Sequence, residues 1–228
     1  MRQRDPVVAP DAFVASSAVL VGDVRVGPGA VIAHGALIIA TGAPVELGAR
    51  VAVMPGAVIR STGGDQRPPH PVRIGDDCLI GPQAALAGCA LGAAVYVATQ
   101  VMVFHGAIVG DGCRLGAGSI VHTGARLPDR TRVGMRQFAV PGPDGTAVVT
   151  SDLDEARELL AAADFFGKVF AEQAPADLIE LHRRSTAAVA AEIRQRGMSA
   201  GHGGHGAQGL ACLLCELPGS PLLTDPKR

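Results

Sequence analysis

Small aliphatic residues recur every six positions along most of this chain. From Ile74 to Leu127 the sequence divides into the blocks IGDDCL, IGPQAA, LAGCA, LGAAVY, VATQVM, VFHGAI, VGDGCR, LGAGSI and VHTGAR. Eight of these nine blocks have six residues, and the block that starts at Leu86 has five. A six-residue period matches neither an amphipathic helix, with 3.6 residues per turn, nor a simple alternating strand. It is typical of a β-helix in which each block forms one short parallel strand and a corner.

The aliphatic residue that starts each block is expected to point into the coil and to stack on its equivalents above and below. The same register runs back to Val8 and forward to Ala139, which gives about seven turns of three blocks each. At one strand spacing per turn the coil would be roughly 34 Å long. The segment 39–45 (IATGAPV) swells one corner, and 61–72 (STGGDQRPPHPV) is a polar, proline-rich excursion that we predict to be a surface loop.

The period changes to a helical one after the coil. Ser151 is predicted to cap a helix that has Asp154 and Glu155 in its first turn and an apolar stripe as far as Phe170. Pro175 is predicted to begin a second helix. The chain should therefore have three parts: a β-helix domain over 1–145, helices over 150–196 that pack on it, and a flexible Gly/His/Cys tail over 197–228.

Composition limits the range of functions. Hydrophobic residues make up 48% of the chain but aromatic residues only 3%, so the core must be built from stacked aliphatic side chains. A formal net charge of -1 argues against nucleic-acid or anionic-membrane partners. The N-terminal residues lack a long apolar run, so no signal peptide is expected, and no apolar run reaches membrane-spanning length. Five cysteines, an odd number, favour reduced thiols in the cytoplasm.

Read residue by residue, the coil resembles the gamma-class carbonic anhydrase family of hexapeptide-repeat proteins, roughly from Val8 to Val140. The resemblance includes the swollen corner before LGAR, the excursion before IGDDCLIG, and the five-residue block LAGCA where the family has HGCTIG. VFHGAIVGDGCRLGAGSIVHTGARLP is similar to the family's VLDGAVVGDGCIIGAGALVTPGTVIP. The resemblance implies a left-handed parallel β-helix followed by C-terminal α-helices, and a homotrimer with its sites between subunits.

The zinc ligands of that family are replaced in this chain. The resemblance places the three zinc-binding histidines at positions that are here Arg60, Pro82 and Ala87. None of these residues offers a neutral imidazole, so no cofactor is expected at the family site. Because the zinc ion lowers the pKa of a bound water towards 7, its loss implies no carbonic anhydrase activity there.

Two histidines near the same cleft are candidates for a rebuilt site. His105 and His122 should lie about one strand spacing apart on one face of the coil. They could serve as a ligand, as a general base, or as part of a relocated metal site, but a third metal ligand is not evident. The alternative is two exposed corner histidines that make ordinary hydrogen bonds. Arg60, Gln83 and Phe104 are the residues that we expect to bind a small molecule in this cleft.

His70 in the excursion is a third candidate. In hexapeptide acyltransferases, a histidine near the subunit cleft acts as the base, and His70 would resemble it, with Asp65 as an orienting carboxylate. However, the chain has PGPDG where such transferases commonly have a terminal Gly-Asn/Ser-Pro-Ala-Lys segment. The alternative is an ordinary surface-loop histidine.

The tail contains a separate set of metal-ligand residues, His202 and His205 followed by Cys212 and Cys215. Two histidines and a Cys-x2-Cys pair suit tetrahedral zinc or another divalent metal. The short separation between the two pairs favours a flexible tail without metal.

Three functions follow from the sequence. The first is a diverged, cytoplasmic, gamma-carbonic-anhydrase-like homotrimer with a degenerate zinc site and a small-molecule or structural role at the intersubunit cleft. The second is a hexapeptide-type acyltransferase or another acyl-thioester enzyme that uses a cleft histidine. The third is an enzyme with a relocated metal site.

Overall fold

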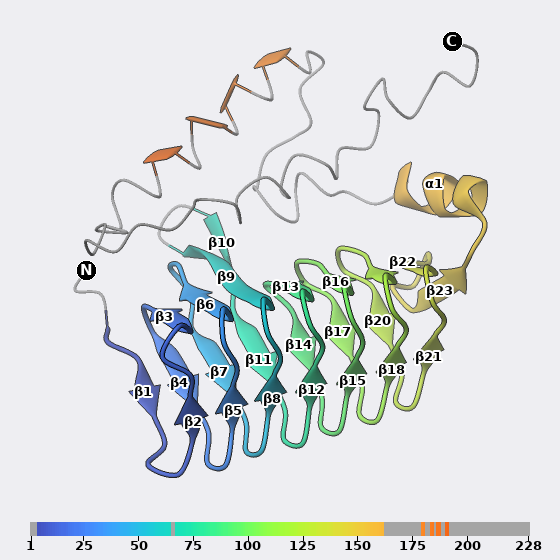
Figure 1. The fold of residues 1–228 in the computed structure, drawn as a ribbon. Helices are drawn as coiled ribbons and strands as arrows, with labels where there is room; N and C mark the ends of the chain where they lie inside the picture. Colours follow the sequence, from blue (N-terminus) through green and yellow to red (C-terminus); the bar gives the residue numbers. More distant parts are fainter. Residues whose placement is uncertain are drawn as a thin grey trace. The chain divides into compact units, whose positions relative to one another are not determined.

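The computed structural model describes residues 4–64 and 67–161, with short helical pieces at 179–180, 183–184, 186–187 and 190–191. The chain divides into two units, Met1–Ala171 and Glu172–Arg228. In the first unit the backbone winds through three parallel sheets in turn, with seven strands of the coil in each sheet (Figure 1). The predicted left-handed parallel β-helix of about seven turns is thereby confirmed.

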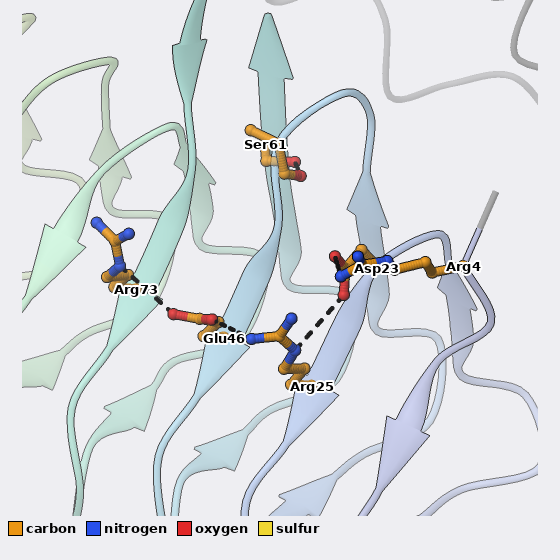
Figure 2. A network of polar contacts seen from close by, with 7 residues as sticks. Arg4, Asp23, Arg25, Glu46, Ser61 and Arg73 are labelled. Atoms are coloured by element: carbon orange, nitrogen blue, oxygen red, sulfur yellow. Dashed lines mark hydrogen bonds and ion pairs between the residues drawn. The ribbon is translucent and has the colours of Figure 1, made fainter. Parts of the chain in front are cut away.

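Sheet A carries an alternating row of charges on its outer side. Arg25 lies opposite Glu46, and Glu46 lies opposite Arg73 on the next strand. Ion pairs join Arg25 to Asp23 at 3.5 Å and to Glu46 at 2.7 Å, and Arg73 to Glu46 at 3.4 Å, as Figure 2 shows. The strands of sheet A are β1 (Val7–Val8), β4 (Val24–Val26), β7 (Val45–Leu47), β11 (Val72–Ile74), β14 (Ala90–Leu91), β17 (Ile108–Val109) and β20 (Arg126–Leu127).

Sheet B is more apolar on its outer side over its first turns. Phe13 lies opposite Val31 there, and further along Arg114 lies over the ring of Tyr96, 5.7 Å from its centroid. The strands of sheet B are β2 (Phe13–Val14), β5 (Val31–Ile32), β8 (Ala52–Val53), β12 (Leu79–Ile80), β15 (Tyr96–Val97), β18 (Arg114–Leu115) and β21 (Arg132–Val133).

Sheet C ends in an antiparallel strand that the six-residue pattern did not predict. Its parallel strands are β3 (Val19–Val21), β6 (Leu37–Ala40), β9 (Val58–Gly64), β13 (Ala85–Ala87), β16 (Met102–Val103), β19 (Ile120–Val121) and β22 (Phe138–Pro141). β23 (Ala147–Thr150) then folds back on β22. The turn between them is closed by Asp144, whose carboxylate accepts a hydrogen bond from the amide of Thr146 at 2.9 Å. The Pro-Asp-Gly sequence of this turn was the signal for a hairpin.

The core is a stack of the aliphatic residues that start each block. Ile32, Ile38, Ile59, Ile80 and Leu86 are among the most completely buried side chains. Each contributes about 1.5–3 kcal/mol through removal of its apolar surface from water. Val8 starts the first block and is 38% exposed, because it lies at the open end of sheet A.

The corners use a left-handed backbone at the fourth residue of most blocks. Residues with side chains occupy this position on several turns, including Arg50, Asp77, Gln83 and Gln100, with φ between 56° and 60°. The five-residue block shifts this conformation to its third residue, Gly88, with φ 53°. The coil therefore tolerates the strain of one left-handed residue per corner.

The excursion at 61–72 is a β-hairpin rather than the predicted loop. β9 continues beyond the coil as far as Gly64, and β10 (Arg67–His70) pairs with it in antiparallel fashion. His70 lies opposite Thr62, with an irregular register between the two ends of β10. The polar sequence suggested a loop, but strand pairing satisfies the backbone of the extension.

Ser61 fixes the swollen corner to the base of this hairpin. Its buried hydroxyl donates a hydrogen bond to the carbonyl of Ala43 and accepts one from the amide of Thr41 at 3.1 Å. The hydroxyl of Thr41 donates to the carbonyl of Ser61 at 2.6 Å. The corner and the hairpin therefore hold each other in place.

The first predicted helix is present as α1 (Leu153–Ala161), which contacts β22 and β23. The predicted cap was wrong by one residue. Asp152, not Ser151, accepts hydrogen bonds from the amides of Asp154 at 2.8 Å and Glu155 at 3.2 Å. The helix begins at Leu153, so the preceding carboxylate is the one that reaches its free amides.

Within the predicted second helix, the described pieces are helical. Arg184 forms an ion pair with Glu180, one turn earlier, at 2.8 Å. The packing of the second helix on the coil stays a prediction, and the tail 197–228 lies outside the described residues.

Candidate functional site

Sheet C leads into sheet A at one corner of the coil, which we call corner CA. Backbone pairing places Ala87 opposite Arg60, and it places Val103 opposite Leu86 and Val121. One column of this corner therefore holds Arg60, Ala87, Phe104 and His122, as the block register predicted. The next residue of each turn forms a second column: Ser61, Gly88, His105 and Thr123.

The second column of corner CA is buried on all four turns. His105 is 1% exposed and Thr123 is 2% exposed. By contrast, equivalent positions at the corner between sheets A and B hold exposed aspartates, among them Asp76, Asp111 and Asp129. Corner CA therefore differs from the corner between sheets A and B, because its polar side chains at this position are shielded from water.

The hairpin brings His70 onto His105. The two imidazole rings meet edge to face, with their centroids 5.3 Å apart and their planes at 75°. Gly88 lies between them, since a Cβ built on it would come 2.6 Å from the Cβ of His70 and 2.9 Å from the Cδ2 of His105. Because only a glycine leaves this space, the five-residue block and the hairpin fit each other.

His105 is a neutral imidazole. Burial lowers its pKa to about 3, and the nearby charges of His70 and Arg60 act in the same direction. Neither of its ring nitrogens has a hydrogen-bond partner among the described residues. A group with so low a pKa is a weak proton acceptor, so His105 is a poor general base but an available hydrogen-bond donor and acceptor.

His122 packs against Phe104 in the first column of corner CA. Its ring meets that of Phe104 edge to face, with the centroids 5.7 Å apart. Backbone pairing places His122 one turn beyond Phe104 in the first column, next to the column of His105. The ring contacts in the structure are those of His105 with His70 and of His122 with Phe104. The alternative of two exposed corner histidines is wrong for His105, which is buried because His70 and Gly88 pack against it.

Thr123 is a site residue that the sequence reasoning missed. It follows His105 by one full turn, and the amide of Gly124 donates to the carbonyl of His105 at 3.0 Å. Its hydroxyl has no hydrogen-bond partner among the described residues. The sequence signal that could have indicated it is that Thr123 is the third residue of its block VHTGAR, just as His105 is the third residue of VFHGAI.

The residues that the resemblance places at the family's zinc positions lie on two corners. Arg60 and Ala87 are neighbours at corner CA, whereas Pro82 and Gln83 belong to the corner between sheets B and C. Gln83 accepts a hydrogen bond from Gln100 at 3.1 Å there. A single chain therefore does not bring Gln83 to Arg60 and Phe104.

Two sets of candidates are not covered by the structure. Asp65 and the four tail residues His202, His205, Cys212 and Cys215 lie outside the described residues. Within the described ranges, no group of three or more histidine, cysteine, aspartate or glutamate residues is arranged to hold a metal ion. None of the helical segments in that part of the chain combines the length and apolar character that a membrane crossing needs.

Curated relatives match about half of the chain. Mitochondrial gamma carbonic anhydrase 1 of Arabidopsis thaliana is 28% identical over 124 residues, which cover 54% of this chain and 45% of the relative. The carnitine operon protein CaiE of Escherichia coli K12 is 34% identical over 129 residues, or 53% of this chain and 59% of the relative. The chain spans about half the length of these relatives. No protein-family model matches it. The predicted resemblance to gamma-class carbonic anhydrases and related hexapeptide-repeat proteins is confirmed.

Solved structures with a similar trace include two transferases. PerB from Caulobacter crescentus, in complex with CoA and GDP-perosamine, has a TM-score of 0.40 and 25% identity, covering 65% of this chain and 58% of that chain. The UDP-N-acetylglucosamine O-acyltransferase LpxA from Moraxella catarrhalis has a TM-score of 0.37 and 16% identity, covering 83% and 92%. Both scores are below 0.5, so neither transferase indicates what this chain does.

Proposed function

We propose that this chain is a gamma-carbonic-anhydrase-like homotrimer that lacks the family's zinc chemistry and binds a small molecule at its intersubunit cleft. The observation that carries the proposal is the intact coil register around replaced ligands. Arg60 and Ala87 are paired neighbours on β9 and β13, yet neither offers a zinc ligand. A guanidinium stays protonated, and an alanine methyl or a proline ring has no donor atom.

The relatives support the scaffold more than the activity. One is named a carbonic anhydrase and the other a carnitine operon protein, so likeness alone does not select a reaction. The trimer, the cytoplasmic location, and the lack of nucleic-acid and membrane partners belong to this proposal as predictions from the sequence.

Restoring the ligands tests the proposal. In the full chain we would replace Arg60, Pro82 and Ala87 together with histidine, and measure zinc content and CO2 hydration against the wild type. Both proteins would carry serine in place of His202, His205, Cys212 and Cys215, so that the tail contributes no metal. We expect stoichiometric zinc only in the triple variant. Stoichiometric zinc with CO2 hydration in the unrestored chain would overturn the proposal.

A second candidate is an enzyme that acts on an acyl thioester. The observation in its favour is the delivery of His70 from the hairpin to corner CA, in contact with His105. His105 is too weakly basic to accept a proton, so the base would be His70 or His122. Calorimetric titration with acetyl-CoA should then show saturable binding. Acceptor-dependent release of CoA should be lost in His70→Ala or His122→Ala. Absence of binding would sink this candidate.

A further inference from the structure

The buried polar column of corner CA calls for a partner that the chain itself does not supply. His105 and Thr123 occupy equivalent positions on successive turns, about one strand spacing of 4.8 Å apart. Both are almost completely buried, and neither side chain has a hydrogen-bond partner among the described residues. Leaving buried polar groups unpaired is costly, so such pairs are usually completed by a ligand or a water.

From this geometry we infer that His105 and Thr123 form the floor of a binding site for a small monocarboxylate of the size of formate or acetate. The inference deepens the proposed small-molecule role and rests on it. A carboxylate accepts hydrogen bonds only, and this floor offers two donors, the ring N–H of His105 and the hydroxyl of Thr123. Hydrogen bonds to a charged acceptor are the stronger kind.

Charge selects an anion over a metal cation. Arg60 is in the adjacent column, and its positive charge is felt at His105, where it disfavours protonation. The same field opposes a divalent cation and favours a carboxylate, whose burial requires a compensating charge. The two imidazoles of His70 and His105, 5.3 Å apart, would otherwise suit a metal ion.

The hairpin supplies the outer side of the site. His70 is half-buried and lies against His105 with Gly88 beneath it. His70 is more exposed than His105 and Thr123, which are almost completely buried. In the proposed site, His70 therefore forms the outer wall and His105 and Thr123 form the floor.

The chain contains its own matched control. Ser119 is also a fully buried hydroxyl without a hydrogen-bond partner among the described residues, but it belongs to the corner between sheets B and C. Removing either hydroxyl should relieve an unpaired polar group. Only the removal of Thr123 should affect a ligand at corner CA.

The experiment is a titration of the full chain with sodium acetate and sodium formate at constant ionic strength, with chloride as the reference anion. Binding would be followed by thermal unfolding and by calorimetry. We expect saturable stabilisation of the wild type. Thr123→Val and Arg60→Gln should weaken binding at least tenfold, whereas Ser119→Ala should leave it unchanged. If Thr123→Val fails to fold, Thr123→Ser should fold and still bind, since it keeps the hydroxyl.

Three results would overturn the inference. No saturable effect of either carboxylate would mean that an internal water completes His105 and Thr123. Equal effects of Thr123→Val and Ser119→Ala would mean that corner CA is not special. Stabilisation by zinc chloride that depends on His105 would mean a cation site. The zinc and CO2-hydration assays test the proposed function separately, so failure of carboxylate binding alone leaves that proposal standing.

Discussion

Replacing Gly88 with alanine should push the imidazoles of His70 and His105 apart. A Cβ at this position would lie 2.6 Å from the Cβ of His70 and 2.9 Å from the Cδ2 of His105, whereas carbon atoms pack best at roughly 3.5–4.0 Å. Gly88 also has a φ of 53°, and a left-handed conformation costs an alanine about 1–2 kcal/mol.

The two costs can be separated within the same corner. Overpacking of a closed site costs about 1–3 kcal/mol, so Gly88→Ala should lower the free energy of unfolding by about 2–5 kcal/mol in total. Gly106 is the matched control. It has a φ of 71°, but a methyl group added there would lie 3.9 Å from its nearest neighbours, which are backbone atoms of Gly124. Gly106→Ala should therefore show the left-handed cost alone.

Urea unfolding, followed by far-ultraviolet circular dichroism at one protein concentration, measures both variants. We expect Gly88→Ala to cost about 1–3 kcal/mol more than Gly106→Ala. His70→Gly, which removes the Cβ that collides, should recover part of this difference when combined with Gly88→Ala. Equal costs for the two alanine variants would refute the close contact between the hairpin and the coil.

Two further predictions concern electrostatics. The pKa of His105 is about 3 in the fold and 6.5 ordinarily, so between these values the unfolded chain binds a proton that the folded chain does not. The free energy of unfolding should therefore be unaffected by His105 above pH 6.5. As the pH falls from 6.5 towards 3, protonation of His105 in the unfolded chain should lower that free energy by about 1.4 kcal/mol per pH unit. Urea unfolding across this range should show a shallower slope in His105→Gln, and parallel slopes would contradict the prediction. Glu46→Gln removes the carboxylate that forms ion pairs with both Arg25 and Arg73. Because all three side chains are partly exposed, the substitution should lower the free energy of unfolding by about 0–1 kcal/mol at low salt and by nothing measurable in 1 M salt. A salt-independent loss in the same assay would argue against an ionic origin.

The coil could be predicted because its information is local and repeated. Each block carries its own inward aliphatic residue, and stacking identical positions buries them all at once. A shift of register would expose all of these aliphatic residues at once, so only one register is stable. Counting blocks in that register therefore predicted the pairing of Arg60 with Ala87 and the column that ends at His122. The positions of the family's zinc ligands came instead from the resemblance, which implies that Arg60, Pro82 and Ala87 stand in their place.

The contacts outside the period depended on the tertiary structure. Nothing in the repeat determines where a hairpin that leaves the coil at Ser61 will lie, so the contact of His70 with His105 could not be read from the sequence. The cap at Asp152 and the return of β23 onto β22 likewise depend on where the chain leaves the last turn.

The sequence by itself determined the coil and its register, and the family resemblance implied that the zinc ligands are replaced. The tertiary structure decided which polar groups are shielded from water. His105 and the exposed Asp111 occupy the same position in their blocks, yet only His105 is buried. Burial depends on what packs across a corner from elsewhere in the chain, and that packing changes an imidazole of ordinary pKa into a neutral group at the floor of a site.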